Sequence, residues 1–357
     1  MRTAKFITVI LLATAALASG CHRRPLDLTM SRGAAITVIA HWDSTGLRPN
    51  GMTVSFYPVS GGNPITTLSN SDTVEVNLPE GEYNLLVFNE TVSDFTNLRF
   101  YDVSNFNGIY AYTGSYSNKY YDNIRETPEK LASFTKPVTV SEDMVRYTLY
   151  YRRGTPPPQD VHASAEDLVI HVWPKLITCV INTRLHATHI DKVASAGGYL
   201  GHFAAGVYLA SGKTLREDAI FAINFEQKDM TGATEGYFSN TSVGFGFYED
   251  VFPPATSGYS FDFFAVLADN SGYRNKMGID DKISTHRGAF DELNIDIDIY
   301  PGAELPDVEG GQAWNIGVNE WENEDVPINL STTHQLKTDG LEVGRPRARL
   351  TRPSDAV

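Results

Sequence analysis

The sequence predicts an all-β protein made of two tandem β-sandwich domains. Aromatic and turn-forming residues are abundant, with 18 Tyr, 18 Phe, 29 Gly and 18 Pro, as is typical of short strands joined by turns. Apolar residues alternate over short runs, and long helical periodicity is scarce. Without its leader the chain is still too long for one typical core, so about two domains are expected.

The chain begins with a segment that has the anatomy of a secretory signal peptide. Arg2 and Lys5 give it a charged start, an apolar run follows, and it ends on the small residues ASG. The apolar run is shorter than the roughly 20 residues that a permanent membrane-spanning helix needs. Residues 1–20 are therefore expected to be removed.

Cys21 follows the leader directly and is one of only two cysteines in the chain. Small residues before a cysteine resemble a bacterial lipobox, in which the signal peptidase cuts ahead of the cysteine and the new terminus is acylated. Ala18 stands where that motif usually has a larger aliphatic residue, and Leu17 lies one place earlier. Three acyl chains would anchor the protein stably, because a single chain binds membranes only marginally. We expect lipidation with residues 21–33 as a tether; the alternative is ordinary secretion with a leftover cysteine.

The mature chain is strongly acidic. The full sequence carries a net charge of −14, and the leader removes two basic residues and no acidic one, which leaves −16. Such a surface repels phosphate backbones, so we expect no nucleic-acid partner. Acylation of Cys21 would leave Cys179 without a disulfide partner, so stability must come from packing.

The first domain is expected over residues 34–153. Strands are predicted for AAITVIAHW, MTVSFYPV, TVEVNL and EYNLLVFN, which are separated by the turn sequences GLRPNG, SGGNP and PEG. KPVTV and EDMVRYTLYYRR are also interpreted as strands, because Val145, Tyr147 and Leu149 recur at every second position. The prolines of GTPPPQDVHASAED then predict an extended linker over residues 154–166.

Residues 97–121 of this domain are dense in Tyr, Asn, Ser and Gly. Aromatic residues interleaved with small polar ones give contact surface at low entropic cost, which makes Tyr110 and Tyr112 candidate ligand or partner contacts. The alternative, which the composition favours, is a long excursion between strands whose tyrosines cover the sandwich.

The second domain is expected over residues 167–331. DLVIHVWPKLITCVINTRLHAT predicts two strands or one bent edge strand, because Pro174 interrupts it. AGGYLGHFAAGVYLASGK is Gly-rich and is interpreted as a loop with a short helix or strand. AIFAINFEQ, EGYFSNTSVGFGFYED, YSFDFFAVLAD and ELNIDIDIY predict further strands, and EDVPINLS a closing strand. Residues 332–357 are expected to form a flexible tail.

Candidate catalytic residues are few. HATHID brings together His186, His189 and Asp191, but polar residues at a strand end explain this group better than a metal site does. Asp296 and Asp298 share one face of a strand, which is expected to be solvated, although paired carboxylates can hydrolyse glycosides. We therefore expect a non-enzymatic protein with no cofactor and no metal.

Three tryptophans, Trp173, Trp314 and Trp321, are the remaining candidates for a binding surface. With nearby tyrosines they could form a platform on which sugars stack, and GQAWNIGVNEWEN is typical of an exposed aromatic loop. The alternative is burial in the core. A glycan therefore stays open as a partner.

With these elements in place, the chain resembles the fimbrillin-type lipoproteins of Bacteroidales. The resemblance rests on CHRRPL, on LPEGEYNLLVFN in the first domain and on LITCVINTRLHATHIDKVASAGGYLGHFAAGVYLASGKT in the second, and it spans most of residues 21–331. It implies two transthyretin-like, Greek-key sandwiches in an outer-membrane lipoprotein that anchors or joins surface fimbriae. Because these motifs are structural, they specify the fold better than the function.

The resemblance also implies a mode of assembly. Polymerising members lose an N-terminal segment to a protease that cuts after Arg, which opens a groove for a neighbour's strand, whereas anchor subunits keep their lipid. Main-chain hydrogen bonds then supply affinity, and pockets for alternate side chains supply specificity. Arg32, Arg152 and Arg153 are candidate cut sites, but their surroundings are too generic to choose among them.

One departure from the family concerns the residues after Cys21. His22, Arg23 and Arg24 stand where surface-exported lipoproteins of these bacteria often carry acidic residues, so the membrane face is open, and the basic run could lie against anionic headgroups. The sequence predicts a fimbrial anchor, minor fimbrial subunit or adhesion component, with other fimbrillin-like subunits as partners. The alternative is a glycan-binding lipoprotein of a polysaccharide uptake system.

Overall fold

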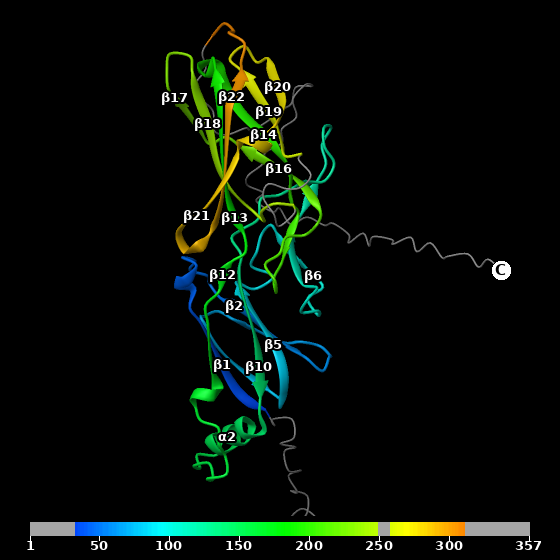
Figure 1. The fold of residues 1–357 in the computed structure, drawn as a ribbon, viewed down its shortest axis with the longest axis vertical. Helices are drawn as coiled ribbons and strands as arrows, with labels where there is room; N and C mark the ends of the chain where they lie inside the picture. Colours follow the sequence, from blue (N-terminus) through cyan, green and yellow to red (C-terminus); the bar gives the residue numbers. More distant parts are fainter. Residues whose placement is uncertain (1–32, 249–257, 311–357) are drawn as a thin grey trace, which may run out of the picture.

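A computed structural model describes residues 33–248 and 258–310 of the chain. Within them nearly all regular elements are β-strands, beside one α-helix and a few short 3₁₀-helices, which confirms the predicted all-β class. Figure 1 shows an elongated molecule with strands of the N-terminal half at one end and strands of the C-terminal half at the other.

The strands fall into two series along the chain. The first series is β1 (Ala34–Ala40), β2 (Met52–Pro58), β3 (Ile65–Ser69), β4 (Thr73–Leu78), β5 (Gly81–Asn89), β6 (Leu98–Tyr101), β7 (Tyr110–Thr113), β8 (Ser115–Tyr116), β9 (Ile124–Arg125) and β10 (Ala132–Val140), followed by the helix α2 (Glu142–Arg152). The second series is β11 (Val169–Val172), β12 (Lys175–Leu176), β13 (Cys179–Thr188), β14 (Val193–Ala204), β15 (Gly206–Tyr208), β16 (Asp218–Asn224), β17 (Gln227–Met230), β18 (Gly236–Gly244), β19 (Ser260–Leu267), β20 (Gly272–Gly278), β21 (Ile283–Arg287) and β22 (Leu293–Glu304).

Two sheets form the N-terminal sandwich, with strand orders β11-β1-β4 and β12-β10-β5-β2-β3. β1 shows why its alternation predicted a strand, because Ala34, Ile36, Val38 and Ala40 are buried while the residues between them are partly exposed. Full burial of an Ile or Val side chain contributes roughly 1.5–3 kcal/mol. The buried residues of β1 therefore help to fix which face of the strand points into the core.

Two larger sheets form the C-terminal sandwich, with strand orders β20-β19-β14-β16-β9-β8 and β17-β18-β13-β22-β21. On β22 the side chains of Ile295, Ile297 and Ile299 are buried in the core, whereas Asp296 and Asp298 lie on the outer face. The predicted solvated face of this strand is thus confirmed.

Strand pairing crosses the predicted linker at residues 154–166. β11 and β12 follow the linker but pair with β1 and β10, so they belong to the sheets of the N-terminal sandwich, although the predicted boundaries assign them to the second domain. In the other direction, β9 pairs with β16, and β7 pairs with β15 in a third, three-stranded sheet of order β15-β7-β6. The two halves of the chain are therefore interlocked by shared sheets.

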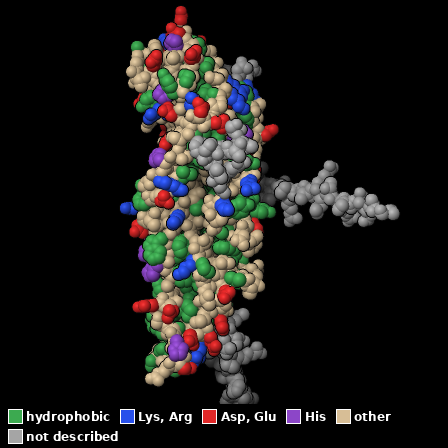
Figure 2. Space-filling view, viewed as in Figure 1, with side chains coloured by type: hydrophobic (Ala, Val, Ile, Leu, Met, Phe, Trp, Pro, Cys, Tyr) green, Lys and Arg blue, Asp and Glu red, His purple; other side chains and the backbone are tan. Residues whose placement is uncertain are grey.

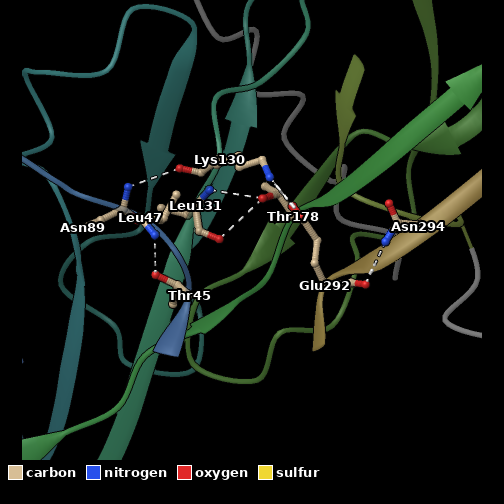
Figure 3. Close-up of polar contacts among 8 residues, drawn as sticks. All are labelled: Thr45, Leu47, Asn89, Lys130, Leu131, Thr178, Glu292 and Asn294. Atoms are coloured by element: carbon tan, nitrogen blue, oxygen red, sulfur yellow. Dashed lines mark hydrogen bonds and ion pairs between the residues drawn. The ribbon is translucent and has the colours of Figure 1, made fainter. Parts of the chain in front are cut away.

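Polar contacts also join the two halves (Figure 3). Lys130 Nζ lies 2.7 Å from a carboxylate oxygen of Glu292. The backbone N–H of Leu131 donates to Thr178 Oγ1 at 3.1 Å, and within the N-terminal half Asn89 Nδ2 donates to the carbonyl oxygen of Lys130 at 3.1 Å. Apolar residues on one face of β5 belong to the same buried cluster as the C-terminal core. Packing, and not the linker alone, holds the sandwiches together.

EDMVRYTLYYRR forms the helix α2, so the predicted strand is wrong. Ser141 caps the helix, since its side chain accepts a hydrogen bond from Met144 N at 3.3 Å, and the first turn carries two carboxylates that favour the helix dipole. The helix rests on β1 through Thr148, whose Oγ1 accepts a hydrogen bond from Ala35 N at 3.1 Å. Alternation of apolar residues over such a short segment is compatible with a helix as well as with a strand, so it did not distinguish the two.

AGGYLGHFAAGVYLASGK contributes most of β14 and all of β15, so the predicted loop is also wrong. β14 is an inner strand that pairs with both β16 and β19. Its glycines make room for side chains of neighbouring strands, because a Cβ on Gly198 would lie 2.4 Å from the ring of Phe261. The glycines therefore reflect close packing inside a sheet.

Candidate functional site

Among the predicted ligand contacts, the structure describes Tyr110, Tyr112 and Trp173. Trp173 is 52% exposed and stacks on His41 with ring centroids 4.8 Å apart, so it is not buried in the core. Cys21, Trp314 and Trp321 lie outside the described residues, as do the predicted closing strand EDVPINLS and the tail 332–357. Lipidation and a platform built on the last two tryptophans therefore stay predictions.

Tyr110 and Tyr112 belong to a group of tyrosines on the three-stranded sheet. Tyr110 pairs directly with Tyr101 on β6 and with Tyr208 on β15. The ring centroids of Tyr110 and Tyr101 are 5.2 Å apart, and those of Tyr110 and Tyr112 or Tyr208 are 5.7 Å apart. We call these four residues the tyrosine ladder. Sequence reasoning missed Tyr101 and Tyr208, because only the register of the strands brings them to Tyr110.

The opposite face of this sheet explains why the ladder points outward. Leu98, Ala111 and Val207 alternate with the tyrosines along the three strands, and all three are buried in the main core cluster. The ladder thus stands on a packed support. Burial raises the pKa of the Tyr110 phenol, and its tyrosine neighbours and Glu217 raise this pKa further, so the phenol is neutral at physiological pH.

The next part of the Tyr-rich segment packs against the C-terminal sandwich. Tyr121 donates a hydrogen bond of 2.6 Å to Asp262 Oδ2, and the Arg274 guanidinium holds both oxygens of the same carboxylate at 2.6 and 3.1 Å. That guanidinium also lies 4.1 Å from the ring centroid of Tyr120. Asp262 is only 1% exposed. This part of the excursion therefore covers the sandwich, which is the alternative that the composition favoured.

Alkaline pH is expected to weaken the fold. Burial raises the pKa of Tyr57 to about 12 and that of the Cys179 thiol to about 12, while burial and the hydrogen bond to Asp262 raise that of Tyr121 to about 12. Because each folded pKa lies above its unfolded value, the neutral groups stabilise the protein below about pH 9 and this contribution is lost as pH rises toward 12. Urea denaturation at stepped pH should show the free energy of unfolding falling across this range. A constant value up to pH 12 would show that the prediction is wrong.

The outer face of β22 carries two aspartate–histidine pairs. His286 Nδ1 lies 2.7 Å from Asp296 Oδ2, and His186 Nε2 lies 3.0 Å from Asp298 Oδ1. Asn182 Nδ2 donates to the other oxygen of Asp296 at 2.9 Å. Each carboxylate is therefore bound to polar side chains of neighbouring strands on an exposed surface.

The chemistry of the described residues is limited. They hold no group of three or more His, Cys, Asp or Glu side chains placed to bind a metal ion. His189 follows β13 with its Nδ1 2.8 Å from the carbonyl oxygen of Leu305, in agreement with polar residues at a strand end. A hollow of about 370 Å³ is lined by Cys179 and Phe290, but the raised pKa of that thiol keeps it unreactive.

Terminal strands decide where a second chain could pair with a sheet. In the N-terminal sandwich, β3 leads directly into β4 and β11 leads directly into β12. At each edge of the sandwich, the chain therefore crosses from the terminal strand of one sheet to the terminal strand of the other. β20, with seven residues, is the longest terminal strand in the described sheets, and its outer edge has no neighbouring strand among the described residues. Unpaired N–H and C=O groups on such an edge are a template for another strand.

The two ends of the molecule differ in their relation to the predicted anchor. β1 begins beside α2, so a tether running from Cys21 to Gly33 would reach the molecule at the α2 end. The β17–β18 and β19–β20 turns lie at the other end (Figure 1). Acidic and basic side chains are interspersed on the face shown in Figure 2. No helix among the described residues combines the length and hydropathy that a membrane crossing requires.

Comparisons with known proteins agree with this architecture. A family model described as a domain of unknown function (DUF5119) matches residues 20–226. A solved structure of a candidate adhesin from Bacteroides ovatus is similar, with a TM-score of 0.55 at 15% identity over 82% of this chain and 98% of that chain. This likeness supports the β-sandwich fold. No curated protein matches the sequence.

Two further solved structures are more distant. A candidate polysaccharide-binding protein from Bacteroides thetaiotaomicron has a TM-score of 0.42 at 9% identity, over 74% of this chain and 89% of that chain. The fimbrial anchor protein Mfa2 from Porphyromonas gingivalis has a TM-score of 0.40 at 8% identity, over 73% of this chain and 88% of that chain. At these scores the two structures add no argument.

Proposed function

We propose, from the premise that the chain belongs to the family described as a domain of unknown function (DUF5119), that it is a non-enzymatic, lipid-anchored protein of the cell envelope. In this role it is a fimbrial anchor, a minor fimbrial subunit or an adhesion component. The observation that carries the proposal is the fold likeness to the candidate adhesin from Bacteroides ovatus, which extends over 98% of that chain.

The predicted lipid and the shape of the molecule support an anchored role. Acyl chains on Cys21 would hold the α2 end at the outer membrane, because β1 begins at that end. The turns at the other end would then be presented away from the lipid. This arrangement suits either membrane face, since it depends only on which end carries the tether.

The pairing of β1 on both of its edges favours an anchor or terminal subunit over a polymerising one. β1 is paired on one side with β11 and on the other with β4, and its alternate side chains fill the N-terminal core. The place between these strands is thus already taken by the chain's own residues. A partner strand would have to add at a free edge, and β20 is the longest edge of this kind in the described sheets.

Deletion of the gene tests the proposed role. The deletion strain is expected to bear fimbriae of altered length or attachment, or to adhere less, and the wild-type gene should restore the defect. A gene carrying Cys21→Ser should restore it poorly, because the protein would no longer be held at the membrane. Unchanged fimbriae and unchanged adhesion in the deletion strain would count against both the fimbrial and the adhesion versions.

A further inference from the structure

The tyrosine ladder has the geometry of a binding platform. Tyr101, Tyr110 and Tyr208 stand directly opposite one another on three adjacent strands, and Tyr112 lies two residues from Tyr110 on the same face. Strands in a sheet are about 4.8 Å apart, so the three paired rings span about 10 Å. Tyr101 is 59% exposed, and the other three rings are half-buried. The platform is therefore open to solvent and fixed by the sheet beneath it.

The polar atoms of the ladder are available to a ligand. Among the described residues, none of the four phenolic hydroxyls makes a hydrogen bond to the protein. Each hydroxyl can donate one hydrogen bond and accept others. A ligand would thus meet apolar ring faces and hydroxyl groups side by side, which matches the alternation of C–H faces and hydroxyls on a sugar ring.

The charges around the ladder are compensated or held in place. Arg125 Nη2 lies 2.9 Å from Glu217 Oε1, and this pair lies near Tyr110, whose pKa the Glu217 charge raises. The Arg99 guanidinium donates to the carbonyl oxygens of Thr96 and Leu98 at 2.8 and 3.0 Å. The Arg125–Glu217 pair is neutral as a whole, whereas the net charge of −14 on the chain repels an anionic ligand and leaves a neutral one unaffected. The charge pattern therefore favours a neutral ligand.

The size of the ladder favours a small ligand over a protein. An aromatic side chain offers about 150–250 Å² when fully covered, so four partly exposed rings offer roughly 300 Å². A stable protein interface buries about 800 Å² on each partner. We propose that the tyrosine ladder binds a neutral oligosaccharide, with Tyr101 and Tyr110, whose ring planes differ by 32°, stacking on adjacent sugar rings and Tyr208, which lies edge-on to Tyr110 at 73°, flanking them.

This inference stands apart from the predicted roles of Trp314 and Trp321, which lie outside the described residues. It is also independent of membrane anchoring, because the ladder is formed by folded strands on the side of the molecule. Sugar binding can fail while the fimbrial role holds, and the fimbrial role can fail while sugar binding holds. The two proposals are therefore tested by different measurements.

Affinity electrophoresis of the full chain purified in detergent tests the inference. Native gels would contain galactomannan, xyloglucan or starch as neutral probes, and polygalacturonate as an acidic probe. At least one neutral polysaccharide should retard the protein, and replacing Tyr101 and Tyr110 together by Ala should weaken that binding at least tenfold. Tyr110→Phe keeps the ring and removes the hydroxyl, so it should cause a smaller loss.

A second tyrosine pair provides the matched control. Tyr147 and Tyr151 on α2 have ring centroids 6.5 Å apart, and Tyr151 is 75% exposed. Replacing both by Ala removes two aromatic rings and two hydroxyl groups from α2, away from the ladder, and should leave sugar binding unchanged. Equal thermal unfolding of all variants would confirm that they fold. The inference is overturned if no neutral probe retards the protein, if only polygalacturonate does, or if the ladder and control variants bind alike.

Discussion

Replacing Cys21 by Ser is expected to move the protein from the membrane fraction to the soluble fraction. The replacement removes the only thiol at the predicted cleavage position, and with it the acyl chains. Each buried CH₂ group of an acyl chain contributes about 0.8 kcal/mol to membrane binding, and stable anchoring needs more than one such signal. Fractionation of cells, with a clickable palmitate analogue as label, measures both attachment and acylation.

The second cysteine supplies the control for this experiment. Cys179 is buried in the core and 1% exposed, so Cys179→Ala leaves the lipidation site intact. This variant should keep both its label and its membrane attachment. A Cys21→Ser protein that still takes up the label and sediments with membranes would exclude Cys21 as the anchor.

Replacing Asp262 by Ala is expected to lower the free energy of unfolding by about 1.5–3 kcal/mol, the range for hydrogen bonds to a charged group, because the Arg274 side chain is 41% exposed and water can solvate its guanidinium. The carboxylate is 1% exposed and binds both the Arg274 guanidinium and the Tyr121 hydroxyl. Its loss would leave a partly buried positive charge and a hydroxyl without their partner. Urea denaturation followed by tryptophan fluorescence measures the change.

One milder variant within this cluster and one outside it provide the comparison. Tyr121→Phe removes one hydrogen bond and should cost about 0.5–1.5 kcal/mol. Asp296→Ala removes a carboxylate from the exposed face of β22 and should cost under about 1 kcal/mol, as exposed ion pairs usually do. If Asp262→Ala costs no more than Asp296→Ala, the buried cluster does not stabilise the fold.

Much of the fold followed from the sequence wherever one face of a strand is buried. β1 and β22 alternate between buried and more exposed positions, so the period of two was visible in their residues. The helix α2 was mistaken for a strand because Val145, Tyr147 and Leu149 also alternate. Its informative signals were local, namely the Ser141 cap and the acidic first turn.

The remaining errors in the predictions from sequence arise because packing between strands distant in the sequence decides the structure. The glycines of β14 suggested a loop, but Gly198 is small because the ring of Phe261, from another strand, fills the space beside it. Composition identified Tyr110 and Tyr112 as candidate contacts, whereas Tyr101 and Tyr208 join them only through strand register. Nothing in a linear pattern shows which strand pairs with which.

Photo-crosslinking from β20 in intact cells tests whether this protein assembles with other envelope subunits at a sheet edge. Gly278 ends β20, and a Cβ built there has no atom of the described structure within 4 Å, so a photoreactive side chain fits. Gly232, in the turn between β17 and β18, is the control, since its Cβ would contact only Glu235 at 3.8 Å.

We expect the probe at position 278 to capture another β-sandwich subunit of the envelope, in adducts that mass spectrometry identifies, and the probe at position 232 to capture none. Adducts at neither position, or the same adducts at both, would contradict assembly through this edge.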